Sequence, residues 1–198
     1  MLRSRRPEEI KKEKMNVYAI TFLLSILVNV IGGYSIYLFS LPAYLDTVGT
    51  ILSGVLMGPV IGGVVGLISG LLLSVLVNPA NLYFTPINIL IGIVTGVIFR
   101  KYYFTLKNII LTAVLVIVFS VILGTLIEYF VFGGFAGKPL VMITEGLVSA
   151  GIDLIIAVKI SNLFTNILDK FLSFAFVFLI ISIMDNYEII ELFNLKIK

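Results

Sequence analysis

The sequence of 198 residues contains no cysteine, no histidine and no tryptophan. The chain therefore has no thiolate nucleophile, no disulfide, no cysteine or histidine metal ligand and no imidazole for acid–base catalysis. Charged side chains are scarce as well: they make up 13% of the residues, against about 25% in typical soluble domains. These absences exclude several classes of enzyme and argue against a soluble domain.

What the sequence has instead is apolar length, with 60% hydrophobic residues and a mean hydropathy of +1.15. We expect an all-α protein, a polytopic transmembrane bundle of about six helices. The apolar segments lie at 17–39, 47–58, 60–77, 86–99, 109–131, 140–163 and 171–184. The segment 47–58 rises only about 18 Å as a helix, against roughly 30 Å of hydrocarbon. It must therefore pack among longer helices or form a broken helix with 60–77.

The first segment is preceded by basic residues, which are Arg3, Arg5, Arg6, Lys11, Lys12 and Lys14. Segment 17–39 is long enough to span a bilayer and ends without an A-x-A-like cleavage site, so we expect a retained helix and not a signal peptide. We divide the chain into a basic cytoplasmic segment at 1–16, a transmembrane domain at 17–184 and a tail at 185–198.

Charge asymmetry predicts the orientation. The loop at 100–107 holds Arg100, Lys101 and Lys107 and no acid, so it should be cytoplasmic, like the N-terminus. The other loops (40–46, 78–85 and 132–139) then face outward. The tail is outside if 140–163 and 171–184 both cross, and inside if one of them is re-entrant or interfacial.

Small residues recur at four-residue spacing, which allows helices to approach closely. They are Gly54, Gly58, Gly62, Gly66 and Gly70, then Gly92 and Gly96, with a weaker pair at Thr21 and Ser25. We interpret most of these glycines as packing within the bundle. A groove that receives a partner subunit is the alternative.

Polar residues distant in sequence converge on the predicted outer half of the membrane, where unpaired polar groups are costly. They are Asn29, Tyr37, Asp46, Asn78, Asn81, Tyr83, Asn88, Glu128, Glu145, Ser149 and Asp153. The last three, spaced by four, should share one helix face that brings Asp153 near the midplane. This pattern predicts an outward-open pocket for a small polar or cationic aromatic molecule. Alternatively, these are ordinary interfacial residues, or the acids pair internally with Lys138 or Lys159.

Enzyme motifs are missing from the sequence. There is no G-x-S-x-G, no P-loop and no H-E-x-x-H, and Ala150-Gly151-Ile152-Asp153 lacks the first glycine of a G-x-G-D protease motif. We expect no enzymatic activity, no cofactor and no metal site. A membrane enzyme that uses carboxylates alone is the least favoured alternative.

The block at 41–96 carries several motifs together. They are L-P-x-x-L-D-x-x-G-T from Leu41, Gly58-Pro59, Asn78-Pro79 and P-x-N-x-x-I-G from Pro86; F-G-G at 132–134 and S-N-x-x-x-x-x-L-D-K at 161–170 follow. This pattern resembles the substrate-binding S component of an energy-coupling factor (ECF) transporter. The resemblance implies a prokaryotic cell-membrane protein of about six helices that captures a vitamin or similar micronutrient at the outer face.

The same resemblance implies partners: a transmembrane coupling subunit and two ATPase subunits, with surrounding lipid and no nucleic acid. S components often carry A-x-x-x-A in the first helix for docking the coupling subunit. Here that position offers Thr21/Ser25 or Ala19/Leu23, and we expect Thr21 and Ser25 to dock the partner. The competing hypothesis is a membrane sensor or partner-binding subunit that transports nothing.

Overall fold

The chain folds into a bundle of α-helices, as the hydropathy pattern predicts. The computed structural model describes residues 7–136, 138–187, 189–193 and 195–197. The helices are α1 (Pro7–Phe39), α2 (Val48–Met57), α3 (Pro59–Leu76), α4 (Asn81–Lys101), α5 (Leu106–Phe132), α6 (Lys138–Ser149), α7 (Leu154–Asn186) and the 3₁₀ helix η2 (Ile189–Phe193). The only β-type pairing in these residues is an isolated bridge between Phe104 and Ile197.

Five of these helices are long and apolar enough to cross a membrane: α1, α3, α4, α5 and α7. Large apolar side chains cover their outer surfaces; Val75 is 84% exposed and Phe130 is 74% exposed. A water-facing bundle would carry polar residues there, whereas a lipid-facing one needs apolar residues. The chain is therefore a multi-pass membrane protein.

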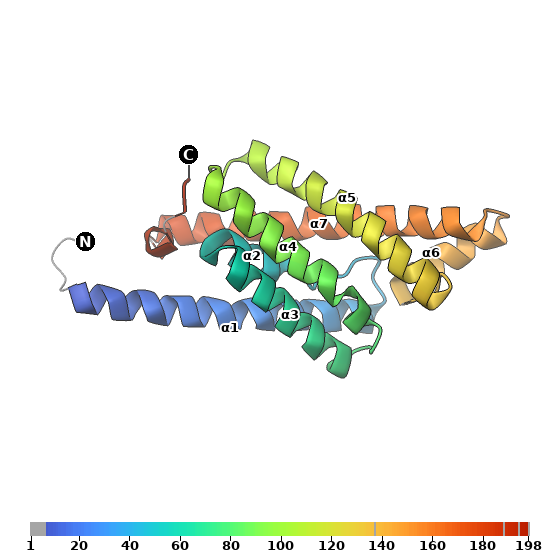
Figure 1. Cartoon of the computed structure of the whole chain (residues 1–198), viewed down its shortest axis with the longest axis horizontal. Coiled ribbons are helices and arrows are strands. Elements are labelled where there is room, and N and C mark those ends of the chain that lie inside the picture. Colours follow the sequence, from blue (N-terminus) through green and yellow to red (C-terminus); the bar gives the residue numbers. More distant parts are fainter. Residues whose placement is uncertain (1–6, 137, 188, 194, 198) are drawn as a thin grey trace.

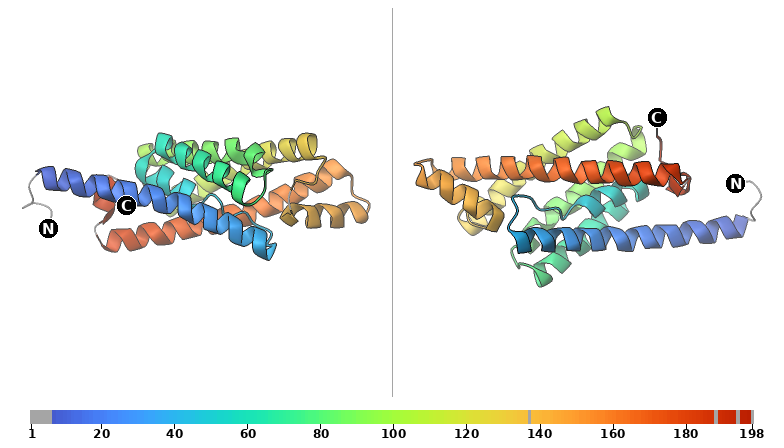
Figure 2. Two further views of the ribbon diagram at one scale, coloured as in Figure 1. Left: turned by 90° about the horizontal axis from the view of Figure 1, so that it is seen from below. Right: turned by 180° about the vertical axis from the view of Figure 1, so that it is seen from behind.

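The ends of the helices gather at two ends of the bundle (Figures 1 and 2). The start of α1, the α2–α3 turn, the α4–α5 connection and the C-terminal segment lie at one end, which we call the terminal end. The α3–α4, α5–α6 and α6–α7 connections lie toward the other end, which we call the opposite end. At the terminal end, Phe193 of η2 stacks on Tyr18 of α1 with ring centroids 4.8 Å apart, and the Phe104 amide donates to the Lys196 carbonyl over 2.7 Å.

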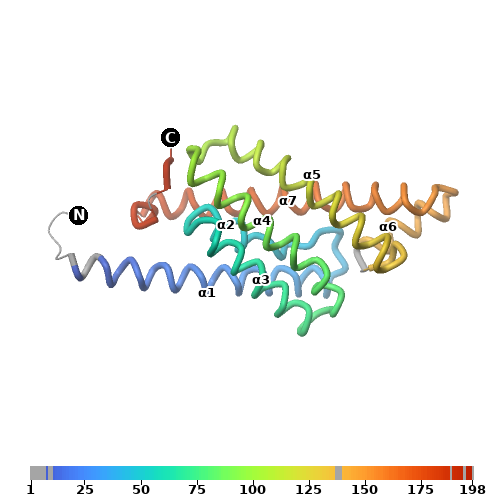
Figure 3. The backbone as a smooth tube through the Cα atoms, viewed as in Figure 1, coloured from blue at the N-terminus to red at the C-terminus, as the bar shows by residue number. Residues whose placement is uncertain are grey.

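The short helix α2 does not span the bundle by itself. The tube in Figure 3 shows residues 40–47 turning back from the end of α1 into the bundle, so that α2 begins partway along it. Every residue of α2 is buried. The prediction that this segment packs among longer helices is therefore confirmed.

Asn29 of α1 ties α2 into the bundle. Its side-chain oxygen accepts a hydrogen bond from the Gly49 amide over 2.7 Å. Its side-chain nitrogen donates to the hydroxyl oxygens of Thr50 over 2.8 Å and Ser69 of α3 over 3.0 Å. Because the first amides of a helix have no partner within it, Asn29 caps α2 from a neighbouring helix.

Glycines let α2, α3 and α4 approach within backbone contact. A Cβ added at Gly54 or at Gly62 would lie 2.7 Å from the carbonyl oxygen of Gly92, closer than real Cβ contacts. The interpretation of these glycines as internal packing is confirmed for this triple crossing.

The boundaries of α6 and α7 differ from the sequence prediction. The helix break falls at 150–153, where Gly151 has a φ of +87°. The predicted break between the segments 140–163 and 171–184 is wrong. Asp169 and Lys170, which lie in it, pair inside the bundle, and α7 runs straight through them. The short α6 lies beside the start of α7, joined to it by a 2.9 Å hydrogen bond from Thr144 to Ser161. The C-terminal segment consequently lies at the same end as the start of α1 (Figure 1).

Candidate functional site

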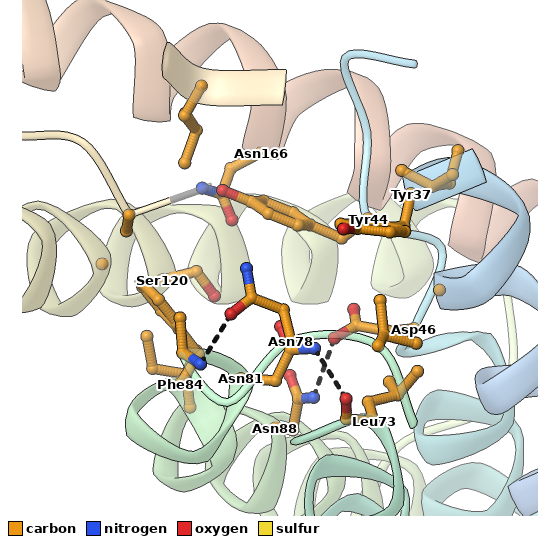
Figure 4. Close-up of a pocket in the computed structure, with 18 of the residues that line it drawn as sticks. Tyr37, Tyr44, Asp46, Leu73, Asn78, Asn81, Phe84, Asn88, Ser120 and Asn166 are labelled. Carbon is orange, nitrogen blue, oxygen red and sulfur yellow. Dashed lines mark hydrogen bonds between the residues drawn. The ribbon is translucent and has the colours of Figure 1, made fainter. Parts of the chain in front are cut away.

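A cavity of about 110 Å³, lined by both polar and apolar side chains, opens among the α1–α2 connection, the α3–α4 connection, α5 and α7. One water needs roughly 10–15 Å³ of such space, so the cavity has room for a small molecule. Its lining residues are Gly33, Ile36, Tyr37, Tyr44, Asp46, Leu73, Val77, Asn78, Ala80, Asn81, Phe84, Ile87, Asn88, Ser120, Gly124, Ala136, Leu140, Asn162, Asn166 and Lys170. In Figure 4, Tyr37, Tyr44 and Asn166 lie on one side of this space, opposite Asn78, Asn81 and Asn88.

The lower wall in Figure 4 comes from the α3–α4 connection and the first turns of α4. The Asn78 side-chain oxygen accepts from the Ala80 amide over 2.9 Å, which shapes the Asn-Pro turn. Asn81 donates over 3.1 Å to the Leu73 carbonyl, which also accepts from the Val77 and Asn78 amides at the end of α3. Asn88, about two helical turns after Asn81, donates to the Asp46 carboxylate over 3.1 Å.

The α7 wall presents two asparagines one helical turn apart. Asn162 donates from its side-chain nitrogen to the Glu128 carboxylate of α5 over 2.6 Å and to the Val158 carbonyl over 3.2 Å. Asn166 donates to the Asn162 backbone carbonyl over 2.9 Å. Gly124 of α5 faces Asn162, and a Cβ there would lie 2.9 Å from the Asn162 side-chain oxygen.

A buried ion pair holds the α1–α2 connection against α7. One Asp169 carboxylate oxygen accepts from the backbone amides of Tyr44 and Leu45, over 3.2 and 2.7 Å. Lys170 pairs with the other oxygen and donates to the Thr47 hydroxyl over 3.2 Å. A buried pair is tolerated only when such extra hydrogen bonds satisfy it. These hydrogen bonds from the α1–α2 connection to Asp169 and Lys170 position Tyr44 and Asp46 at the cavity.

Charge at the cavity is dominated by Asp46. Burial and the neighbouring Asp169 carboxylate raise the pKa of Asp46, while Lys170 and the Asn88 hydrogen bond act in the opposite direction. Burial, followed by the carboxylates of Glu128, Asp169 and Asp46, raises the pKa of Tyr44 well above its ordinary value. Since Lys170 is neutralised by Asp169, ionised Asp46 leaves this wall with a net negative charge.

The structure brings five of the predicted site residues to the cavity: Tyr37, Asp46, Asn78, Asn81 and Asn88. Two others lie elsewhere. Asn29 is fully buried and uses its side chain to link α1, α2 and α3. Tyr83 is exposed and packs edge-on against Phe132 with ring centroids 5.2 Å apart.

The predicted acids are more dispersed than expected. Glu128 is fully buried behind Asn162 and does not line the cavity. Glu145, Ser149 and Asp153 are exposed. Glu145 and Ser149 lie one turn apart on α6, but Asp153 does not share their face, because α6 ends at Ser149. Asp153 instead caps α7, accepting from the Ile155 amide over 3.0 Å.

The predicted docking pair is also placed differently. Ser25 is fully buried where α1 crosses α2, with its backbone against Gly49, so it offers no surface to a partner. Thr21 is half-buried. Ala19 and Leu23 are exposed and line a shallow apolar groove with Met57, Ile61 and Val64.

Sequence reasoning missed the α5 and α7 contributions to the cavity. The missed polar residues on these two helices are Ser120, Asn162, Asn166 and Lys170. Tyr44 in the α1–α2 connection and Phe84 in α4 were missed as well. A signal was present: Asn162, Asn166 and Asp169 recur at helical spacing, but they share a face only if the helix continues through Lys170.

Comparisons of the chain with protein-family models, with curated proteins and with solved structures gave no match. The geometry of the cavity therefore carries the functional argument.

Proposed function

We propose that this chain is the membrane-embedded substrate-binding subunit of an ATP-driven importer of the ECF type, capturing a vitamin-like or other small micronutrient. The observation that carries the proposal is the cavity, in which Asp46 and five asparagines gather around one open space inside the bundle. Polar groups in a membrane protein face ligand pathways or one another, and this set leaves a space between its members.

The placement of the cavity supports capture from one side of a membrane. The cavity is built by connections that lie away from the terminal end, which carries Arg100, Lys101 and Lys107. With these basic residues in the cytoplasm of a prokaryotic cell, the cavity faces outward. Energy must come from other subunits, because the sequence has no P-loop.

A coupling subunit would dock on the lipid-facing surface of α1. Because Ser25 is buried, the groove at Ala19 and Leu23 is our revised proposal for this contact. Small and apolar residues there allow the close helix approach on which association in membranes depends.

The test is the set of proteins that co-purify with the tagged chain, extracted from its own cells in mild detergent. We expect one further integral membrane protein and ATPases that carry P-loops. Co-purification with a signalling protein in their place would support the sensor hypothesis, and a chain that purifies alone would contradict the importer.

A further inference from the structure

Each of the five cavity asparagines has one end of its side-chain amide hydrogen-bonded to the protein. In four of them this end is the NH₂ group, and in Asn78 it is the oxygen. An asparagine side chain has a carbonyl oxygen that only accepts and an NH₂ that only donates. Asn81, Asn162 and Asn166 donate to carbonyl oxygens of the backbone, which only accept, and Asn88 donates to the Asp46 carboxylate. These partners fix the orientation of all four amides.

All four therefore keep a side-chain oxygen for a ligand. Asn162 uses both of its N–H bonds, whereas Asn81, Asn88 and Asn166 each keep one further N–H. Among the described residues, the side-chain oxygens of these four asparagines accept no hydrogen bond. All four oxygens are accessible from open space. Asn78 is the opposite case: its oxygen accepts from Ala80, so its NH₂ is left to the cavity, as its position in Figure 4 shows.

The other polar groups do not reverse this balance. Lys170 directs its charge to Asp169 and Thr47. The hydroxyls of Tyr44 and Ser120 can either donate or accept, so they favour neither kind of ligand. Asp46 adds carboxylate oxygens to the same side as Asn88.

We infer that the cavity selects a planar, nitrogen-rich molecule that presents several N–H donors and carries at most one positive charge. Against an anion, four amide oxygens would stay unpaired and the Asp46 carboxylate would repel the ligand. A binding site discriminates strongly against a ligand that leaves its buried polar groups unpaired. The rings of Tyr37, Tyr44 and Phe84 supply flat apolar surface for such a molecule. An amino-substituted nitrogen heterocycle has this chemistry, whereas a carboxylate or phosphate compound lacks it. The inference rests on the proposed function, since it names the substrate class of the same cavity.

The experiment compares benzamidine with benzoate, two planar molecules of similar shape. Benzamidine presents only N–H donors and one positive charge, and benzoate presents only acceptors and one negative charge. Binding to the purified protein in lipid nanodiscs is measured by saturation-transfer NMR with competition. We expect benzamidine to bind at least tenfold more tightly than benzoate.

Two cavity variants assign this binding to the amides. Asn166→Leu removes one acceptor and should weaken benzamidine binding at least fivefold, while Asn16→Leu, at an exposed position of α1 near the terminal end, should not change it. Asn78→Asp keeps an oxygen for the Ala80 amide and replaces the NH₂ that faces the cavity by an acceptor, so it should strengthen benzamidine binding. This gain cannot come from a misfolded protein.

The outcomes separate the two proposals. Tighter binding of benzoate, lost in Asn166→Leu, would overturn the N–H donor inference and leave small-molecule capture standing. Equal binding of both probes in every variant would show adsorption outside the cavity and overturn the inference. Binding of neither probe would overturn the inference and count against capture as well.

Discussion

Asn88 of α4 donates its side-chain hydrogen bond to Asp46 in the α1–α2 connection over 3.1 Å. The two residues are 42 positions apart in sequence, yet they form one wall of the cavity. The contact orients the Asp46 carboxylate and turns the Asn88 oxygen toward the open space. A carboxylate held this way is the main source of charge available to a ligand.

Asp46→Asn should therefore abolish the pH dependence of cation binding. Asp46 faces Asp169, Lys170 and the Tyr44 hydroxyl, and its raised pKa means that it gains a proton at a higher pH than the ordinary value near 3.9. As pH falls through this raised pKa, the wild-type protein should lose affinity for benzamidine, because protonation removes the attracting charge. In Asp46→Asn the affinity should be lower at neutral pH, by about tenfold, and flat with pH.

The stability of the same variant provides the control. The fold disfavours ionised Asp46, so wild-type stability should decline as pH rises above about 3.9, and Asp46→Asn should not show this decline. The variant should melt at neutral pH no lower than the wild type. A variant that melts earlier and binds benzamidine normally would make Asp46 a structural residue.

The Asn29 side chain should act in stability and not in binding. Asn29→Leu leaves the Gly49 amide without its cap and should lower the free energy of unfolding by about 1–3 kcal/mol. Asn16→Leu, at an exposed position of the same helix, is the matched control and should change stability little. Melting curves and benzamidine titrations of both variants check this; a loss of affinity in the folded Asn29→Leu protein would return Asn29 to the site.

Two glycines in helices offer a direct test of backbone packing. Gly62→Ala places a methyl group 2.7 Å from the Gly92 carbonyl oxygen and should cost about 1–3 kcal/mol of stability. Gly146→Ala in α6 meets nothing within 4 Å and should be neutral or stabilise the helix by up to about 1 kcal/mol. Equal melting temperatures would contradict the close crossing of α2, α3 and α4.

Orientation is testable because the chain has no native cysteine. Ser149→Cys at the exposed end of α6 should react with an impermeant thiol reagent on whole cells, and Lys101→Cys should react only after the cells are broken. The reverse pattern would place the cavity on the cytoplasmic side and exclude capture from outside.

The sequence was sufficient for the helical class and for much of the α3–α4 part of the cavity. Hydropathy locates the apolar helices up to α5, and Asn78, Asn81 and Asn88 lie at or after a proline-marked break that stands out in an apolar chain. The α7 wall was not predicted, because the adjacent charges Asp169 and Lys170 interrupt the apolar stretch and lower its hydropathy as a loop would. Only the three-dimensional structure shows that these charges pair with each other and that Asp169 accepts from the Tyr44 and Leu45 amides, which lie more than 120 positions earlier.

The prediction that Asp153 lies near the midplane on the face of Glu145 and Ser149 was wrong for a related reason. Four-residue spacing predicts a shared face only within one continuous helix, and Gly151, with its positive φ, ends that continuity. The prediction that Asn29 lines the ligand pocket was wrong for another reason. A buried amide in a membrane helix can cap a neighbouring helix as well as bind a ligand.

The most direct test of the central claim, that this cavity captures a small molecule, is native mass spectrometry of the protein released from nanodiscs made with its own membranes. We expect a bound small molecule of one defined mass on the wild-type chain. We also expect this added mass to be lost in the Asn81→Leu/Asn166→Leu double variant and retained in Asn16→Leu. A wild-type chain with no added mass, or an added mass that persists in the double variant, would contradict the claim.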